Sequence, residues 1–510
     1  MINNDLDRGD ILEKYSFSTL DRVMAWMSVV LGYLFIRVIP VRENRLAGAL
    51  FLLVLWGCVC AWLYYSGVRP TVRSLVFAVG AVAMIPSIVV TSDEFLIWWL
   101  YLGELVVLMY FISTAGGNSV EKRLGGMLAA DVAGAVFTAP LGDLRALPGA
   151  ILVKRPGGLG KKIGKTLLWI LLGLCLAVIP TFIITLMLSF DQGFNRLMDN
   201  IFSFDIRWSE QVWRRIVAAI FGIPVAVYGF GAVMASRRHS IADKMTGERC
   251  ESLAQRARCL PAALVYAAVT PILAVYVIFF ISQWEVYMSA FTGRLPDGFI
   301  YSEYAREGFF QLVCVCAINA CIMLGVHLFV QRRNKATQIL LKIYIIVMSV
   351  MTLILVATAL SRMALYIKAY GLTLDRIHAS WFMMVLAVAF VLSILKQIWT
   401  KLRFTSVLLG CVAVMFAVLI YGNANAIVAN YNADAYLDGR LESVDVREIN
   451  DMEHAGIDAL MRLSESAPDS GVRHSAEKYL QERRSEIEDS KMSLWGFNFP
   501  EARARKIINE

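Results

Sequence analysis

Charged residues are scarce in this sequence. Only 18% of its 510 residues are Asp, Glu, Lys or Arg, whereas 58% are hydrophobic. The mean hydropathy is +0.60. A soluble domain carries about 25% charged and about 45–50% apolar residues. The deficit of charge argues against a soluble globular protein and indicates a chain that lies largely in lipid.

Long stretches that alternate between apolar and polar residues are also missing, which disfavours a membrane β-barrel. The apolar residues gather instead in blocks of roughly 17–25, the length that a helix needs to cross a bilayer. We therefore predict an all-α, polytopic integral membrane protein with about eleven transmembrane helices. The predicted spans are residues 23–39, 46–65, 74–90, 95–113, 166–190, 216–235, 261–281, 309–330, 339–360, 377–398 and 406–421.

Motifs of known catalytic and metal sites are absent as well. The sequence has no HExxH, no GxSxG and no pair of CxxC motifs at zinc spacing. Its nine cysteines are interpreted as small apolar residues or free thiols. A glycine-rich run at 157–166 fails the phosphate-loop spacing, because Leu159 stands where the first glycine is required. The sequence therefore predicts no catalytic residue, no metal and no cofactor.

The blocks divide the chain into five regions. Residues 1–22 form a polar cytoplasmic segment and no signal peptide, because no cleavage site follows the first apolar block. Residues 23–113 hold four spans and residues 166–421 hold seven. Between them, 114–165 is a basic, Gly/Pro-rich cytoplasmic linker with a predicted interfacial helix around 124–137. Residues 422–510 form a polar tail, in which apolar residues recur at helical spacing from Val446 to Leu463.

Loop charge predicts the orientation. The net charge of +8 lies mainly in alternate loops between apolar blocks, which is the pattern of membrane topology rather than of nucleic-acid binding. The rule that basic loops stay inside places the N-terminus in the cytoplasm and the C-terminus outside it. Arg37, Arg42 and Arg45, between the first two spans, run against this assignment. The expected partners are the lipid bilayer and an extracytoplasmic protein bound through the tail, with no nucleic acid.

Short stretches in the second half of the chain carry a family resemblance. They are YAREGFFQL at 304–312, YGLTLDR at 370–376 followed by WFM at 381–383, and NAIVANYN at 425–432. These stretches resemble a bacterial family of multi-pass membrane proteins known only as domains of unknown function. The resemblance implies a polytopic protein of the bacterial plasma membrane with an extracytoplasmic tail. It brings no established activity and transfers no catalytic residue.

A candidate polar mouth lies at the outward ends of the eighth and tenth spans. It consists of Glu303, Arg306, Glu307, Arg376 and His378. We predict that one of the two glutamates pairs with one of the three basic residues, because both loops would lie on the same side of the membrane. The alternative is that these charges simply face water and lipid headgroups at helix ends.

Three polar residues lie inside predicted spans. Glu104 is near the middle of the fourth span, where a carboxylate should face the bundle interior and have a partner. It is either a proton or cation site or a hydrogen-bonded structural group. Asn319 is expected to hydrogen-bond between helices. His327 is expected at the cytoplasmic interface.

The sequence favours a non-enzymatic membrane protein with a sensing or assembly role, because a polar mouth and a helical tail are predicted on the same side. A transporter or lipid-handling protein is the alternative, since Glu104, Pro180 and Pro224 fall within spans. An intramembrane enzyme is a third reading, because such enzymes can scatter their residues among helices.

Overall fold

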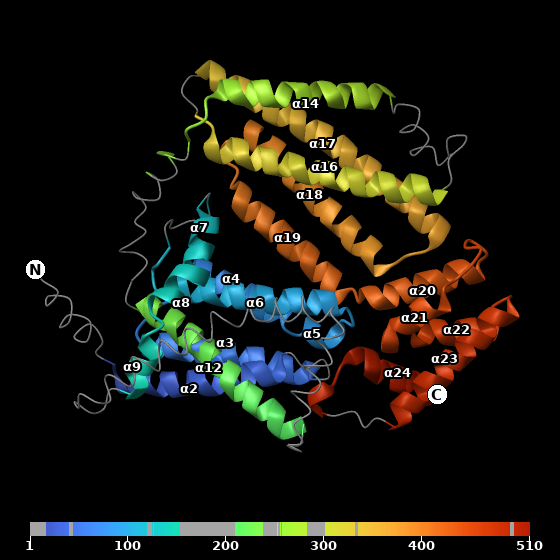
Figure 1. Cartoon of the computed structure of the whole chain (residues 1–510), viewed down its shortest axis with the longest axis horizontal. Coiled ribbons are helices and arrows are strands. Elements are labelled where there is room, and N and C mark those ends of the chain that lie inside the picture. The colour runs from blue at the N-terminus through green and yellow to red at the C-terminus, as the bar shows by residue number, and fades with distance from the viewer. Residues whose placement is uncertain are drawn as a thin grey trace, which may run out of the picture. The chain divides into compact units, whose positions relative to one another are not determined.

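The computed structural model is helical in the part of the chain that it describes (Figure 1). Besides a few single positions, this part comprises residues 17–39, 44–119, 127–152, 210–237, 258–282, 301–331, 335–489 and 494–509. It contains no strand, and its one β-bridge joins Leu260 to Val330. The all-α fold class predicted from the sequence is confirmed.

Ten of the described segments are long and apolar enough to cross a membrane. They coincide with ten of the eleven predicted spans, while the predicted span 166–190, with Pro180, lies outside the described residues. The ten are α2 (Thr19–Val38), α3 (Arg45–Tyr65), α4 with α5 (Val72–Met84 and Ser87–Val90), α6 (Glu94–Ala115), α12 (Glu210–Arg237), α14 (Ala262–Ser282), α16 (Tyr301–Phe329), α17 (Lys335–Tyr370), α18 (Leu374–Ile398) and α19 (Phe404–Tyr421).

The chain forms two compact units. The first comprises Met1–Ile85, Leu102–Val120 and Ala129–Met245. The second comprises Pro86–Tyr101, Glu121–Leu128 and Thr246–Glu510. The boundary between the units falls between α4 and α5 and within α6, and each unit is described separately below.

In the first unit, α2 packs tightly against α12. The backbones meet at Gly32 and Gly222, where a Cβ on Gly32 would lie 2.2 Å from the Gly222 carbonyl oxygen. Small residues allow membrane helices this close approach. At the ends of these helices, Arg237 forms a 2.6 Å ion pair with the buried carboxylate of Asp21. The linker adds four short elements: α7 (Leu128–Ala133), the π-helix η1 (Gly134–Thr138), α8 (Ala139–Gly142) and α9 (Ala146–Leu152).

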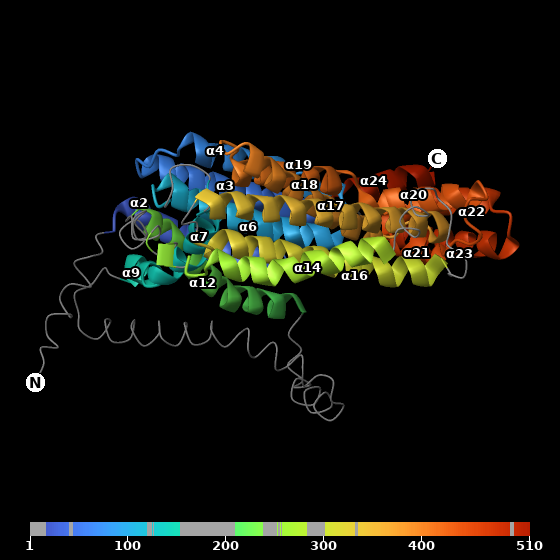
Figure 2. The ribbon, with the colours of Figure 1, turned by 90° about the horizontal axis from the view of Figure 1, so that it is seen from above.

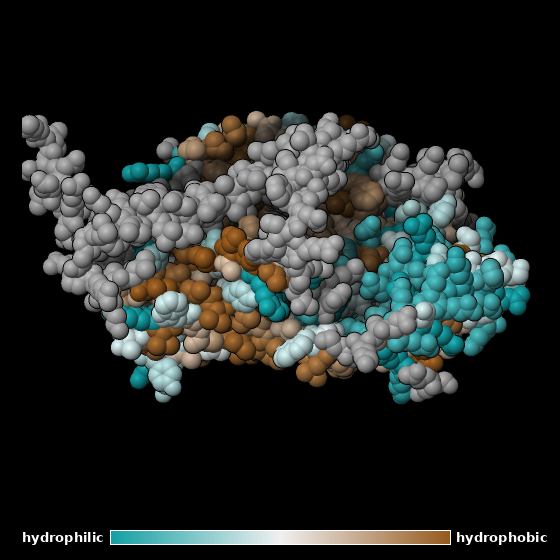
Figure 3. Space-filling model, turned by 60° about the horizontal axis from the view of Figure 1, so that its bottom comes forward, coloured by the Kyte–Doolittle hydropathy of each residue, from teal (hydrophilic) through white to brown (hydrophobic). Residues whose placement is uncertain are grey.

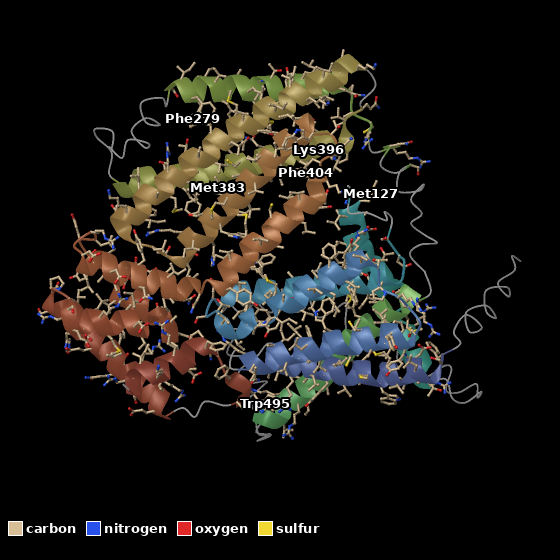
Figure 4. The ribbon with its side chains drawn as sticks, turned by 180° about the vertical axis from the view of Figure 1, so that it is seen from behind. Met127, Phe279, Met383, Lys396, Phe404 and Trp495 are labelled. Atoms are coloured by element: carbon tan, nitrogen blue, oxygen red, sulfur yellow. The ribbon has the colours of Figure 1, made fainter. Side chains whose placement is uncertain are left out.

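In the second unit, α14, α16, α17, α18 and α19 form the membrane-length bundle (Figure 2). Buried Phe309, Leu355 and Met383 belong to a core shared by α16, α17 and α18. Phe279 on α14, labelled in Figure 4, packs against the same core. The α17 helix is the longest, with 36 residues.

The tail is a folded helical module of the second unit, and its surface is hydrophilic (Figure 3). Its predicted apolar residues, from Val446 to Leu463, are buried, but a 3₁₀ turn around Glu453 (φ 52°) breaks their helix. The tail's elements are α20 (Ala424–Leu437), α21 (Val446–Asp451), η2 (Glu453–Gly456), α22 (Ile457–Ser466), α23 (Ser470–Asp489), η3 (Leu494–Gly496) and α24 (Phe499–Asn509).

Candidate functional site

The tail is joined to the α17–α18 connection by a pair of hydrogen bonds. The Leu372 N–H donates to Asn432 Oδ1 (2.7 Å), and Asn432 Nδ2 donates to the Leu372 carbonyl (2.8 Å). Leu372 itself is buried in the hydrophobic core of the tail. Gly371 precedes it with a φ of +78°, and a Cβ there would lie 2.6 Å from Asn432 Oδ1. Only glycine suits both the backbone conformation and the close contact.

The Arg376 side chain bonds to the backbone of the α17–α18 connection and does not line a described cavity. Its guanidinium donates to the carbonyl oxygens of Tyr370 (3.1 Å) and Gly371, which end α17. It also lies 4.1 Å from the centre of the Tyr366 ring. A cation at the C-terminal end of a helix is favourable because it meets the partial negative charge of the last carbonyls. Thr373 caps the following helix by accepting from the Arg376 N–H.

His378 pairs with Asp93, which was not among the site residues predicted from the sequence. Its Nε2 lies 2.7 Å from Oδ2 of Asp93, whose side chain is 3% exposed. The other carboxylate oxygen of Asp93 accepts from the Leu96 N–H and so caps α6. The ring of Phe95 lies 5.2 Å from the imidazole. An Asp directly before a helix is a recognisable cap, but its long-range partner has no local signal.

The other members of the predicted polar mouth are Glu303, Arg306 and Glu307. They lie in the first turns of α16, and their side chains are outside the described part of the structure. Their pairing with Arg376 or His378 therefore stays a prediction.

Glu104 lies inside the first unit and is 3% exposed. The indole N–H of Trp56 on α3 donates to its Oε2 at 2.9 Å. The Trp56 ring also packs against Phe111, with 5.3 Å between ring centres. The carboxylate thus faces a neighbouring helix and accepts a hydrogen bond there, which offsets part of the cost of burying it.

Asn319 connects three helices of the second unit. The Tyr276 hydroxyl on α14 donates to its Oδ1 (2.6 Å), and its Nδ2 donates to Thr352 Oγ1 on α17 (2.9 Å). Thr352 in turn donates to the Met348 carbonyl. This chain of bonds is the kind that holds helices together in lipid.

His327 is exposed in the last turn of α16.

Each unit contains a cavity that is lined by described residues. The first, which we call the apolar cavity, has a volume of about 450 Å³ and is lined by α2, α3, α6 and α12. Its polar side chains, Ser28 and Tyr228, already donate to the carbonyls of Met24 and Val136. The space is therefore suited to an apolar occupant.

The second, which we call the Arg362 cavity, has a volume of about 340 Å³ and lies between α14, α16 and α17. Its polar lining consists of Tyr276, Gln311 and Arg362. Arg362 was missed by the sequence analysis because the predicted span ended at residue 360, whereas α17 continues to Tyr370. The apolar residues after Arg362, such as Met363 and Leu365, are the signal that could have extended the span.

Among the described residues, no group of three or more His, Cys, Asp or Glu side chains is arranged to hold a metal ion.

The model of a family described as a domain of unknown function, DUF4153, matches residues 74–463. No curated protein and no solved structure matches the chain.

Proposed function

Since the chain belongs to the DUF4153 family of unknown function, we propose its role from its own geometry: a multi-pass membrane protein whose tail senses or assembles with a protein partner. The supporting observation is the attachment of the tail to the α17–α18 connection through Asn432 and Leu372. A partner bound to the tail would act directly on the backbone between two membrane helices.

The internal bonding of the tail supports this proposal. Arg462 donates to Asp434 and Asn430, and so holds α22 against α20. Arg483 on α23 donates to the side chain and the carbonyl of Asn450 (both 3.0 Å). A module fixed at several points can pass a displacement to its attachment site, whereas a flexible tail could not.

Photo-crosslinking in intact cells tests the partner. A photoreactive residue at exposed Arg473 or Gln481 of the tail is expected to give a discrete protein adduct. The matched control is the same residue at exposed Lys401, in the α18–α19 connection. No adduct from the tail, together with full function after truncation from Asp434 onward, would contradict the proposal.

Asn432→Ala tests the coupling. The variant removes both bonds to Leu372 while the rest of the tail core remains. When the partner is added, hydrogen exchange at the α17–α18 connection is expected to slow in the wild type but not in Asn432→Ala. Gln481→Ala, an exposed change on the same module, should behave as the wild type. Equal protection in all three proteins would contradict a route through Leu372.

Lipid handling is the second candidate, and the apolar cavity favours it. In a membrane protein, the natural apolar occupant is a lipid acyl chain. Val106→Trp would fill the cavity, while Val107→Trp changes the adjacent residue, which does not line it. With reconstituted protein, transfer of fluorescent phosphatidylcholine between vesicles should fall for the first variant only. Equal transfer by both variants would remove this candidate.

A further inference from the structure

The η3 turn and the start of α24 carry large apolar side chains on the surface of an otherwise hydrophilic tail (Figure 3). Leu494 is 73% exposed, Trp495 is 56% exposed and Phe499 is 55% exposed. We call these three residues the Trp495 patch, after the tryptophan that is labelled in Figure 4. Large apolar side chains gathered on a polar surface indicate a site of contact with a partner or with a membrane.

The core of the tail does not account for the Trp495 patch. On α24, the residues that pack into that core are Ala504 and Ile507, which meet Ile457 and Ile487. The three patch residues belong to neither of the two described clusters of buried residues in the tail. The α24 helix therefore attaches to the tail through its later turns and presents Phe499, in its first turn, on the surface.

Polar contacts hold the backbone that carries the patch. Asn498 Oδ1 accepts from the Glu501 N–H (2.9 Å) at the start of α24. Asn498 Nδ2 donates to the carbonyl of Gly496 in η3 (3.2 Å). The rings of Phe497 and Phe499 lie 5.4 Å apart in an edge-to-face arrangement. The patch is thus presented by a folded turn, so its insertion into another phase costs little conformational entropy.

The neighbours of α24 place the patch at the level where membrane spans end. The α24 helix contacts α5, which forms the last turn of the span Val72–Val90 (Figure 1). The α5 helix also contacts α19, the span that leads into the tail. All three elements belong to the second unit. The start of α24 therefore lies beside the membrane surface.

Exposed aromatic residues mark the same level elsewhere in the second unit. Phe95, Trp98 and Trp99 lie in the first turns of α6, directly after α5, and each is more than half exposed. Tryptophan is enriched at membrane–water interfaces because its ring is largely apolar and its N–H is polar. The Trp495 patch combines Trp, Phe and Leu, which are the side chains that interfacial segments place in lipid.

We propose that the Trp495 patch inserts into the headgroup region of the bilayer and anchors the tail to the lipid surface. Lipid is the occupant because the patch continues the lipid-facing surface formed by the ends of the spans. The apolar side chains should reach about 5–10 Å into the boundary between headgroups and acyl chains. This inference concerns η3 and α24 and does not depend on the protein partner proposed for the tail.

Spin labelling of the full-length protein in phosphatidylcholine nanodiscs tests the proposal. In a cysteine-free background, Leu494→Cys and Phe499→Cys carry a nitroxide, and Gln481→Cys, at an exposed position on α23, is the control. Oxygen, which concentrates in lipid, should relax the labels at 494 and 499 more than a water-soluble nickel chelate does, with the reverse at 481. A stronger effect of nickel at 494 and 499 would place the patch in water and overturn the proposal. Weak effects of both reagents would show that protein covers the patch and would overturn the assignment to lipid.

A second set of variants tests whether the aromatic rings are the anchor. In the Leu494→Cys protein, Trp495→Ser combined with Phe499→Ser should shift the label toward water, so that the effect of nickel rises relative to that of oxygen. Trp495→Phe keeps an apolar ring and should leave the depth of the label unchanged. Both positions are exposed, so the tail core stays intact. An unchanged depth in the double variant would overturn the role of the patch.

Discussion

At the scale of single residues, the bond between Trp56 and Glu104 carries a direct prediction. Trp56→Phe leaves the buried Glu104 oxygen without this donor, so we expect the protein to lose about 1–3 kcal/mol of stability. Glu104→Gln keeps an acceptor oxygen and should change stability by less than about 1 kcal/mol. Unfolding of the purified protein by SDS titration measures both. Trp26→Phe, at a 59% exposed position, is the control, and equal losses at both tryptophans would contradict the role of the bond.

The burial of His454 predicts that the stability of the tail depends on pH. Burial lowers the pKa of its imidazole below the ordinary value of 6.5. The unfolded chain therefore binds more protons than the folded one between these two pKa values. Tail stability should be fully present above pH 6.5 and should fall as the pH drops from 6.5 toward the folded pKa.

Hydrogen exchange of α21 and α22 between pH 5 and 8, corrected for intrinsic rates, checks this dependence. His454→Gln should flatten it, whereas His474→Gln, at an exposed position on α23, should not. A dependence that persists unchanged in His454→Gln would show that another group titrates.

Single polar residues inside spans could be predicted from the sequence, whereas their long-range partners could not. An isolated carboxylate in a span, such as Glu104, is visible because lipid makes it costly. The partner of His378 is not visible, because Asp93 is 285 positions away and only helix packing brings them together. The position of Arg362 inside a long helix could have been predicted, since the apolar pattern continues past it.

At the scale of elements, the crossing of α2 and α12 depends on Gly222. A Cβ at this position would lie 2.7 Å from the Tyr33 backbone nitrogen, so Gly222→Ala must push the helices apart. We expect a loss of about 1–3 kcal/mol, as for other overpacked sites. Gly229→Ala on the same helix meets nothing within 4 Å and should be neutral or slightly stabilising. Thermal unfolding in detergent compares the two, and matching losses would contradict the close crossing.

Helix identity was predictable from block length alone, because the hydrocarbon core sets the minimum span. The residues at which the helices begin and end were not predictable in this way. The α16 helix begins at Tyr301, in the polar stretch before its apolar block, and α17 continues to Tyr370 because the apolar pattern extends past Arg362. In the tail, the spacing of buried residues was correct, but the 3₁₀ turn between α21 and α22 had no clear signal.

At the scale of the whole molecule, the tail and the α18–α19 connection adjoin opposite ends of the α17–α18 hairpin in the second unit. The tail joins the C-terminal end of α17, while Lys335 and Lys401 lie at the opposite ends of α17 and α18. Basic residues favour the cytoplasmic side, so we predict that the tail is extracytoplasmic. In a cysteine-free background, Gln481→Cys should react with an impermeant maleimide in intact cells. Lys401→Cys should react only after permeabilisation, and the reverse pattern would invert the orientation.

The bond between Leu372 and Asn432 also has a consequence for how the protein is made. The two residues are 60 positions apart, and α19 must emerge between them. At about 5–20 residues per second, synthesis leaves the Leu372 backbone without this partner for roughly 3–12 s. During this interval the connection between α17 and α18 is open, in the sense that Leu372 lacks its hydrogen bonds to Asn432. Slower translation between these codons should lengthen the interval in which quality-control proteases can recognise the open hairpin.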